Sequence, residues 1–310
     1  MKHFLMPVAL LACFASQSFA QDLNATVASQ SGDFARPVDA TPDPDGNTFY
    51  FTAIGPTGAG VFRVAATGGP ATRVFAGAPL VRPTGISISS DGRQLFIADP
   101  DAWAGGGRLG QIFVLSTSGG SPLPLRGAAG TGARGIELIS QGGQDAVYFT
   151  GHNSSDRTPG IYRISASGAD SPTVVLEGAP LVEPDSVAIG RFGAVYVTDR
   201  GVTPFTGKVY KVDRDAVSTI VDIMRPGNPA GLAVSLDESR LLVSTLQPYR
   251  TRAQVLVVDL ATLETSASTQ AVGQNPGAGG LHRARNVAIY SWCGSPRGPV
   301  FKIMAAGMAF

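Results

Sequence analysis

The sequence predicts an all-β fold, a six-bladed β-propeller with four-stranded blades. The first observation behind this prediction is a near-identical heptapeptide that occurs twice, as GAPLVRP at residues 77–83 and GAPLVEP at residues 178–184. The second is that the residues after each copy have counterparts in four further places, which gives six units at intervals of 45 to 51 residues. Repeats of about this length, rich in short β-branched and aromatic runs, are typical of propeller blades. The anchors of the six units are Pro37, Pro83, Ala133, Pro184, Pro229 and Ala278.

Each unit shows the same elements in the same order, and the second unit illustrates them. A short run at residues 85–88 is the expected innermost strand, and a turn at 90–92 separates it from a second strand at 95–98. A variable loop leads to residues 111–114, whose counterparts alternate apolar and polar residues, as expected of a strand with one buried face. A glycine turn then leads to a fourth strand, at residues 71–75 in the first unit. Four strands in each unit make one blade.

The two ends of the chain are expected to meet in the last blade. The sixth unit supplies three strands before Phe310, whereas the segment 22–29 precedes the first anchor and alternates like a strand, with Leu23, Ala25 and Val27 in register. An unpaired edge strand invites aggregation, and propellers avoid one by closing the ring. We therefore expect the N-terminal segment to form the outer strand of the last blade, with residues 21–310 as a single domain.

Composition narrows the class of partner. The chain has 310 residues, of which 44% are hydrophobic and 15% charged, and its 24 basic residues nearly balance its 23 acidic ones. Without a basic excess, nucleic acid is not an expected partner. No apolar run approaches the ~20 residues that a membrane helix needs. We expect a monomer that binds a small molecule or a protein.

Residues 1–20 read as a secretory signal peptide. Lys2 and His3 precede a short apolar stretch, and Ser18 to Ala20 form a small-x-small cleavage site before Gln21. The predicted location is periplasmic or secreted. An alternative interpretation takes residues 10–13 as a lipobox, which would leave Cys13 as a lipid-modified N-terminus. If Cys13 is removed, Cys293 is the one remaining thiol and no internal disulfide can form.

Charged residues gather where the chain enters each first strand and leaves each second strand, and these loops meet at one mouth of the channel. Asp185 and Asp199 are the candidate catalytic residues, and Asp185 is also a candidate metal ligand. With Asp99 and Glu183, they could hold a hard cation such as Ca²⁺ through oxygen ligands. The alternative is that these acids form salt bridges between blades, with partners among Arg82, Arg134 and Arg200.

Other polar and aromatic residues of the same loops are candidate ligand-binding residues. The full set is Asp99, Trp103, Arg134, His152, Asn153, Tyr249 and Trp292. The aromatic members, with Phe205, belong to four different loops and could form a rim that stacks on a ring-bearing ligand, or could simply anchor those loops. His152 and His282 lack metal-ligand spacing, and no G-x-S-x-G motif supports a nucleophilic serine.

The repeated patterns resemble those of NHL-type and gluconolactonase (senescence marker protein) propellers. The matching segments include Pro83-Thr84-Gly85-Ile86, the run from Asp91 to Asp99 and the run from Gly160 to Ile164. The resemblance implies one divalent ion, usually calcium, held in the channel by a Glu, an Asn and an Asp, and hydrolysis of a lactone or small ester.

Only one position of this chain matches the ion site of that family. Pro184-Asp185-Ser186 corresponds to the family's aspartate, but Arg134 stands where the Asn is expected, and Val38 and Asp39 stand where the Glu is expected. A cationic side chain beside a metal site opposes cation binding. A non-catalytic propeller that binds a ligand or a protein is therefore the alternative function.

Overall fold

The structure is a computed structural model that describes residues 23–30, 32–203, 206–214, 216–227, 229–247, 252–267, 278–294 and 298–305, without the side chains of residues 223 and 305. The predicted signal peptide, the lipobox, Phe205 and Tyr249 lie outside the described residues. Within the described part, no helix is long and apolar enough to cross a membrane.

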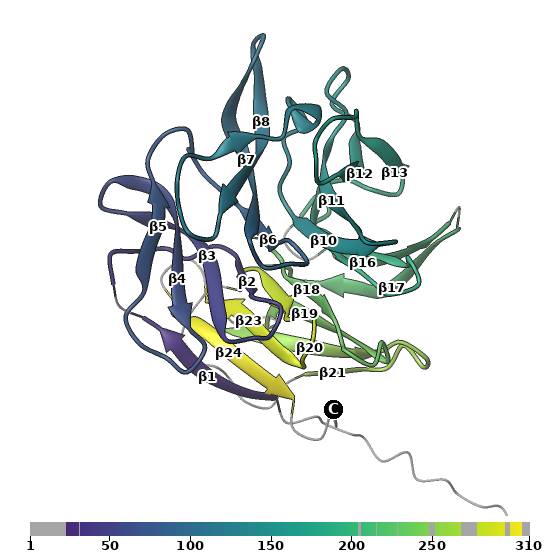
Figure 1. Cartoon of the computed structure of the whole chain (residues 1–310). Coiled ribbons are helices and arrows are strands. Elements are labelled where there is room, and N and C mark those ends of the chain that lie inside the picture. The colour runs from purple at the N-terminus through teal and green to yellow at the C-terminus, as the bar shows by residue number, and fades with distance from the viewer. Residues whose placement is uncertain are drawn as a thin grey trace, which may run out of the picture.

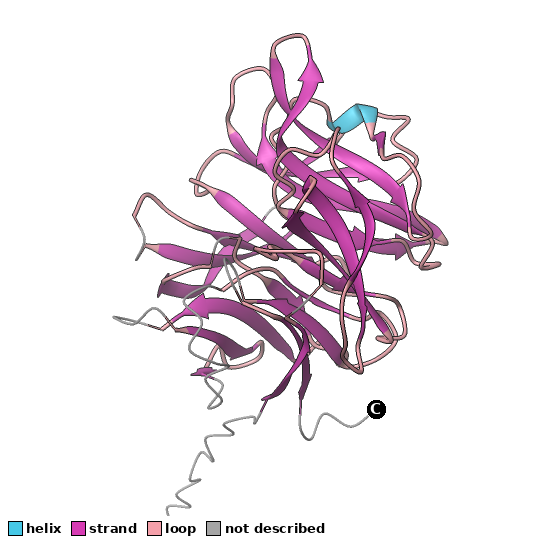
Figure 2. Ribbon diagram, turned by 90° about the vertical axis from the view of Figure 1, so that its left-hand side faces the viewer, coloured by secondary structure: helices cyan, strands magenta, loops and turns pink. Residues whose placement is uncertain are grey.

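Six four-stranded antiparallel sheets are arranged around one axis (Figure 1). Blade 1 contains β2 (Ala40–Pro42), β3 (Thr48–Gly55), β4 (Gly58–Ala65) and β5 (Thr72–Ala76), and blade 2 contains β6 (Gly85–Ile88), β7 (Gln94–Gly105), β8 (Arg108–Ser116) and β9 (Leu123–Pro124). Blade 3 contains β10 (Ile136–Gln141), β11 (Gln144–His152), β12 (Pro159–Ser165) and β13 (Thr173–Glu177), and blade 4 contains β14 (Pro184–Ile189), β15 (Val195–Asp199), β16 (Gly207–Asp213) and β17 (Ala216–Met224). Blade 5 contains β18 (Leu232–Val234), β19 (Arg240–Leu246), β20 (Ala253–Asp259) and β21 (Thr265–Ala267). The predicted six-bladed all-β fold is confirmed, and the described chain contains one short 3-10 helix, Arg126–Ala128 (Figure 2).

Blade 6 is closed by the N-terminal segment, as predicted. It contains β22 (Leu281–Arg283), β23 (Ile289–Cys293) and β24 (Val300–Ala305), and its outer strand is β1 (Leu23–Ser29). β1 pairs antiparallel with β24, from Leu23 opposite Ala305 to Ser29 opposite Val300. Figure 1 shows the purple β1 beside the yellow β24, so the first and last strands of the chain share one sheet.

The hydrophobic core lies between neighbouring blades rather than in one central mass. Six clusters of buried side chains each join two adjacent blades. In the cluster between blades 6 and 1, for example, Cys293 packs with Phe49 and Phe51 of β3. Successive side chains along a strand therefore serve two different clusters, so both faces of strands such as β11 and β15 are buried and their sequences read as nearly continuous apolar runs.

Two mouths are defined by the direction of the innermost strands β2, β6, β10, β14, β18 and β22. We call the end where these strands begin the first mouth and the end where they finish the second mouth. At the first mouth, blades approach so closely that a side chain on Gly135 would collide with the carbonyl oxygen of Asp185. Glycine at the start of an innermost strand thus permits the backbones of neighbouring blades to touch.

Candidate functional site

Asp185 lies at the first mouth, where β14 begins, and it is 2% exposed. Its Oδ2 accepts a hydrogen bond from the backbone amide of Ala230 at 2.7 Å. Burial disfavours the charged form and raises the pKa of Asp185 to about 6, although this amide and the nearby guanidinium groups of Arg200 and Arg134 act in the opposite direction. A carboxyl group in this state can change protonation near neutral pH.

Glu183 lies between two arginines at the same mouth. Its Oε1 is 2.6 Å from Nη1 of Arg134 and 3.6 Å from Nη1 of Arg200. Because Arg134 precedes β10 and Glu183 precedes β14, the shorter pair joins blade 3 to blade 4. This is the salt-bridge arrangement that stood as the alternative to a metal cluster.

Asp99 and Asp199 occupy corresponding positions in blades 2 and 4, and both of their carboxylate oxygens accept bonds from backbone amides. Asp99 accepts from the amides of Val81, Arg82, Asp101 and Ala102, at 2.7 to 3.2 Å. Asp199 accepts from the amides of Val182, Glu183 and Gly201, at 2.7 to 3.2 Å. Each aspartate thus binds the backbone amides of one copy of the repeated heptapeptide. This shared structural role explains why the heptapeptide occurs twice.

The aromatic candidates do not come together in the described residues. Trp103 lies on the β7–β8 hairpin, opposite Leu109, and is 65% exposed. Trp292 is instead a core residue of β23: it is fully buried against Phe301, and its indole N–H donates to Ser244 at 2.8 Å. An apolar surface of this size favours burial in the core over a position on the rim.

His152 and Asn153 lie at the first mouth, where β11 ends. His152 is half-buried, and within the described part of the chain its Nδ1 has no hydrogen-bond partner. Burial, followed by the charges of Arg157 and Arg134, lowers the pKa of His152. The Asn153 amide donates to both carboxylate oxygens of Glu177, at 3.2 and 3.3 Å. Asn153 therefore shapes its own loop.

A buried charge network in the channel was not predicted from the sequence. The ring of His282, on β22, lies between two carboxylates, with Nε2 3.1 Å from Asp39 Oδ2 and Nδ1 2.8 Å from Glu137 Oε2. Burial alone would lower the pKa of His282, but the two carboxylates outweigh it and raise the pKa to about 10. The ring is therefore a cation that donates from both nitrogens.

Glu137 could have been found from its surroundings in the sequence. It is the one charged residue in β10, and its neighbours Ile136, Leu138 and Ile139 are apolar. Such a residue is buried only with a partner. The partner, His282, is 145 residues away, and no local pattern indicates the pairing.

The residues around Asp185 do not fit a divalent cation. Ca²⁺ takes 6–8 oxygen ligands. Both oxygens of Asp99 and of Asp199 already accept backbone amides, and Glu183 lies between two guanidinium groups. In the part of the chain that the structure describes, no three His, Cys, Asp or Glu side chains are grouped so that they could hold a metal ion.

Comparisons with known proteins show the architecture. No family model and no curated protein sequence matches the chain. Among solved structures, it is similar to a gluconolactonase from Xanthomonas campestris (14% identity, TM-score 0.58, 92% of this chain and 90% of that one). It is also similar to regucalcin, a calcium-binding protein from Agrobacterium tumefaciens (12% identity, TM-score 0.61, 93% of this chain and 96% of that one).

The same architecture also occurs in a chain of a protein complex. A chain of the nidogen/laminin complex has 18% identity and a TM-score of 0.59, over 75% of this chain and 80% of that one. The chain thus shares a propeller architecture of the gluconolactonase and regucalcin type. Fold alone does not fix a function.

Proposed function

We propose that this propeller hydrolyses a lactone or another small ester at its first mouth, with Asp185 as the general base. The observation that carries the proposal is the buried carboxyl group of Asp185, whose pKa burial raises to about 6. A general base is most effective with a pKa near the working pH, and perturbed carboxyl groups are concentrated at functional sites. The architecture shared with a gluconolactonase is consistent with this choice of substrate.

In this proposal, the Asp185 carboxylate accepts a proton from water as the water oxygen attacks the ester carbonyl carbon. The guanidinium groups of Arg134 and Arg200 stabilise the negative charge on the carbonyl oxygen. The ester C–O bond then breaks, and the departing alkoxide oxygen takes the proton from Asp185. A lactone yields one hydroxy acid. No metal step is included, because the residues around Asp185 do not fit a divalent cation.

The test is a lactone-hydrolysis assay on the purified protein, with gluconolactone and a set of small esters as substrates. We expect activity to rise with pH around a midpoint near 6 and to survive EDTA. D185N should lower kcat by about 10² to 10⁴, the usual contribution of a general base. D33N, at an exposed position, is the matched control. Absence of hydrolysis of every substrate, or full activity in D185N, would reject the proposal.

A non-catalytic binding platform is the second candidate, and the exposed indole of Trp103 favours it. The Trp103 side chain is 65% exposed, and it lies on a hairpin that extends away from the ring (Figure 1). Exposed tryptophans are enriched among the residues that contribute most to binding interfaces. W103A should then abolish capture of the partner while D185N leaves it intact, and the reverse pattern would exclude this function.

We also propose that the protein is exported as a monomer, with residues 1–20 removed. Mass spectrometry of the periplasmic or secreted protein should then show a chain that starts at Gln21. A lipid-modified chain that starts at Cys13 would support the lipobox alternative instead. Gel filtration tests the monomer.

A further inference from the structure

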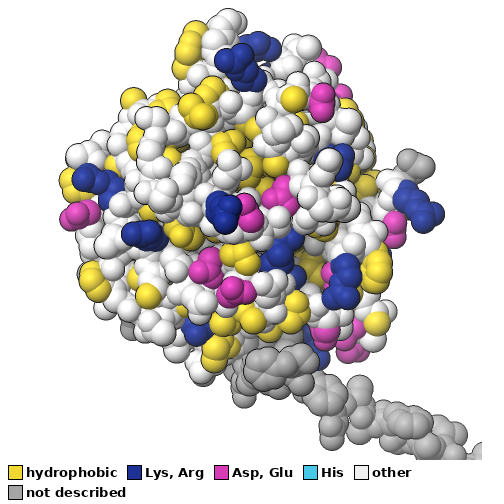
Figure 3. All heavy atoms as spheres, in the orientation of Figure 1, with side chains coloured by type: hydrophobic (Ala, Val, Ile, Leu, Met, Phe, Trp, Pro, Cys, Tyr) yellow, Lys and Arg dark blue, Asp and Glu magenta, His cyan; other side chains and the backbone are white. Residues whose placement is uncertain are grey.

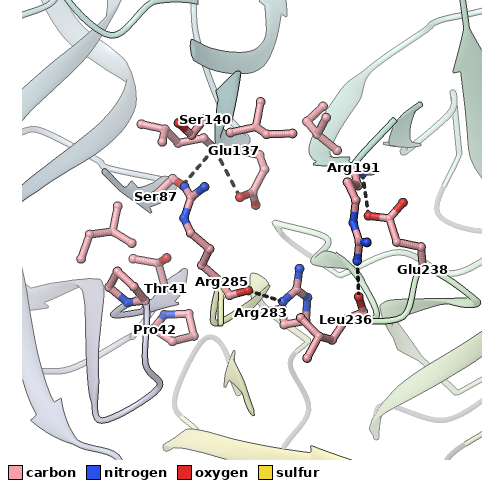
Figure 4. A pocket seen from close by; sticks show the side chains of 15 residues that line it. Thr41, Pro42, Ser87, Glu137, Ser140, Arg191, Leu236, Glu238, Arg283 and Arg285 are labelled. Carbon is pink, nitrogen blue, oxygen red and sulfur yellow. Dashed lines mark hydrogen bonds between the residues drawn. The ribbon is translucent and has the colours of Figure 1, made fainter. Parts of the chain in front are cut away.

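A polar cavity of about 260 Å³ lies at the second mouth, on the opposite side of the propeller from Asp185. All six blades contribute to its wall, because the innermost strands and the turns after them end there (Figure 4). The face that carries this mouth shows basic and acidic side chains close together near its middle (Figure 3). The cavity is smaller than the ~300–1,000 Å³ of sites for drug-sized ligands, so it suits a small molecule.

Two of the three arginines in the wall are held by the protein itself. Arg283 donates to the backbone oxygens of Val234, Ala284 and Arg285, at 2.6 to 3.0 Å. Arg191 donates from its guanidinium to the carbonyl oxygen of Leu236 at 3.1 Å, and its backbone amide donates to Glu238 at 2.6 Å. Both side chains therefore have structural partners.

The third arginine, Arg285, is different. It is half-buried, and its guanidinium group makes no hydrogen bond or ion pair with any residue that the structure describes. Figure 4 shows it beside Ser87, on the side of the cavity where Glu137 lies. Ser87 Oγ accepts a bond from the Leu138 amide at 3.1 Å, so its own O–H is left to donate. Arg285 and Ser87 thus present donors that the protein does not use.

Charge in the wall favours a single negative charge on the ligand. Three arginines and two glutamates line the cavity, which leaves an excess of one positive charge. Below them, the His282 cation and the Asp39 carboxylate balance each other. The partial burial of Arg285 strengthens the attraction between its guanidinium group and an anion, relative to a fully exposed pair.

We propose that this cavity is a second ligand site, which binds a small monocarboxylate through Arg285 and Ser87. The planar guanidinium fork matches the two oxygens of a carboxylate, and the Ser87 hydroxyl adds a third donor. A monocarboxylate also carries the single negative charge that would neutralise the excess positive charge of the wall. The site is independent of the hydrolysis proposed at the first mouth.

Isothermal titration calorimetry of the full mature chain tests this site with acetate, propionate, lactate, inorganic phosphate and ethylammonium as probes. We expect one-to-one binding of at least one of the three monocarboxylates, tighter than that of phosphate or ethylammonium. R285Q should weaken it at least ~10-fold, since bonds to charged groups contribute that much, and R285K should weaken it less. R93Q, on an exposed turn, is the matched control and should bind as the unmodified protein does.

A variant with the opposite effect keeps the test decisive if R285Q fails to fold. E238Q removes one negative charge from the wall and keeps an oxygen for the Arg191 amide, so it should tighten monocarboxylate binding. The proposal is overturned if no monocarboxylate binds, if phosphate or ethylammonium binds more tightly, if R285Q keeps full affinity, or if E238Q does not gain any. D185N should bind as the unmodified protein does, which separates this result from the hydrolysis test.

Discussion

His282 and Glu137 meet across the propeller axis, with Nδ1 of the histidine 2.8 Å from Oε2 of the glutamate. They belong to blades 6 and 3, which stand opposite each other in a ring of six. Asp39 extends the connection, since its Oδ2 also accepts the backbone amide of Ile86 at 2.9 Å. Four blades are therefore joined through one buried cation, which stabilises the ring from its centre.

Loss of this cation should destabilise the fold. H282Q removes the charge between the buried Asp39 carboxylate and the partly buried Glu137 carboxylate, and breaking a buried pair costs about 3–5 kcal/mol. The free energy of unfolding, measured by urea denaturation at pH 6.5, should fall by that order. The matched control is H152Q, because the half-buried His152 forms no ion pair with a carboxylate in the described part of the chain, and its effect should be small. Equal effects of the two substitutions would contradict a structural role for the network.

The same network predicts a loss of stability in alkali. The pKa of His282 is raised from 6.5 to about 10 in the folded protein, so its contribution is complete below about pH 6.5 and disappears as the pH rises through 10. The melting temperature of the unmodified protein should therefore fall between pH 7 and pH 10.5, whereas that of H282Q should change less. Parallel curves for the two proteins would show that the histidine does not carry this charge.

Asp99 and Asp199 should behave as two copies of one structural device. In D99N or D199N, one oxygen that accepts a loop amide becomes an NH₂ group that cannot accept, which costs about 1–3 kcal/mol. The two sites lie in different blades, so the double variant should show the sum of the two losses in urea denaturation. If D199N instead abolished lactone hydrolysis with unchanged stability, Asp199 would be a catalytic residue rather than a loop anchor.

The fold was predictable because its information is repeated along the chain. Six units carry the same order of apolar runs and glycine turns, so an ambiguous strand in one unit is settled by its counterparts. The closing strand was predictable too. The sixth unit lacks a fourth strand, and the segment that contains Leu23 lacks a sheet to join until it pairs with that unit. A short strand such as β9, Leu123–Pro124, shows the limit, since an outer strand has little burial to mark it.

The candidate site was harder to predict from the sequence, because side chains from distant parts of the chain meet there. Asp185 was found from its place after an anchor proline, but its pKa depends on burial, which the sequence does not give. Trp292 was placed on the rim because its position in the repeat borders a loop, yet the strand β23 continues through it. Glu238 was not singled out because the chemistry was expected at the other mouth.

Removing the closing strand should open the ring. Deletion of residues 21–30 exposes the edge of β24 and uncovers the cores that Leu23 and Ala28 complete, at 2% and 3% exposure. We expect the melting temperature to fall by about 10 °C or more, since 1 kcal/mol corresponds to about 2–4 °C in a domain of roughly this size. An unchanged melting temperature would mean that three strands suffice for blade 6. Addition of a synthetic peptide of residues 21–30 should restore part of the loss.

Asp185 should lower the stability of the protein at the pH where it could act as a base. The unfolded residue has a pKa near 3.8 and the folded one near 6, so the folded state binds more protons between these values. Stability is then greatest below about pH 4 and falls as the pH rises through 6, by about 3 kcal/mol in all. D185N retains an oxygen for the Ala230 amide without the buried charge, so urea denaturation should show a gain of that order at pH 8 and little gain at pH 4. D33N should show no such difference between the two pH values.

A D185N variant that is inactive and yet more stable at pH 8 would show that Asp185 serves function at a cost in stability. A loss of stability at pH 8 would instead assign Asp185 to the support of blade 4.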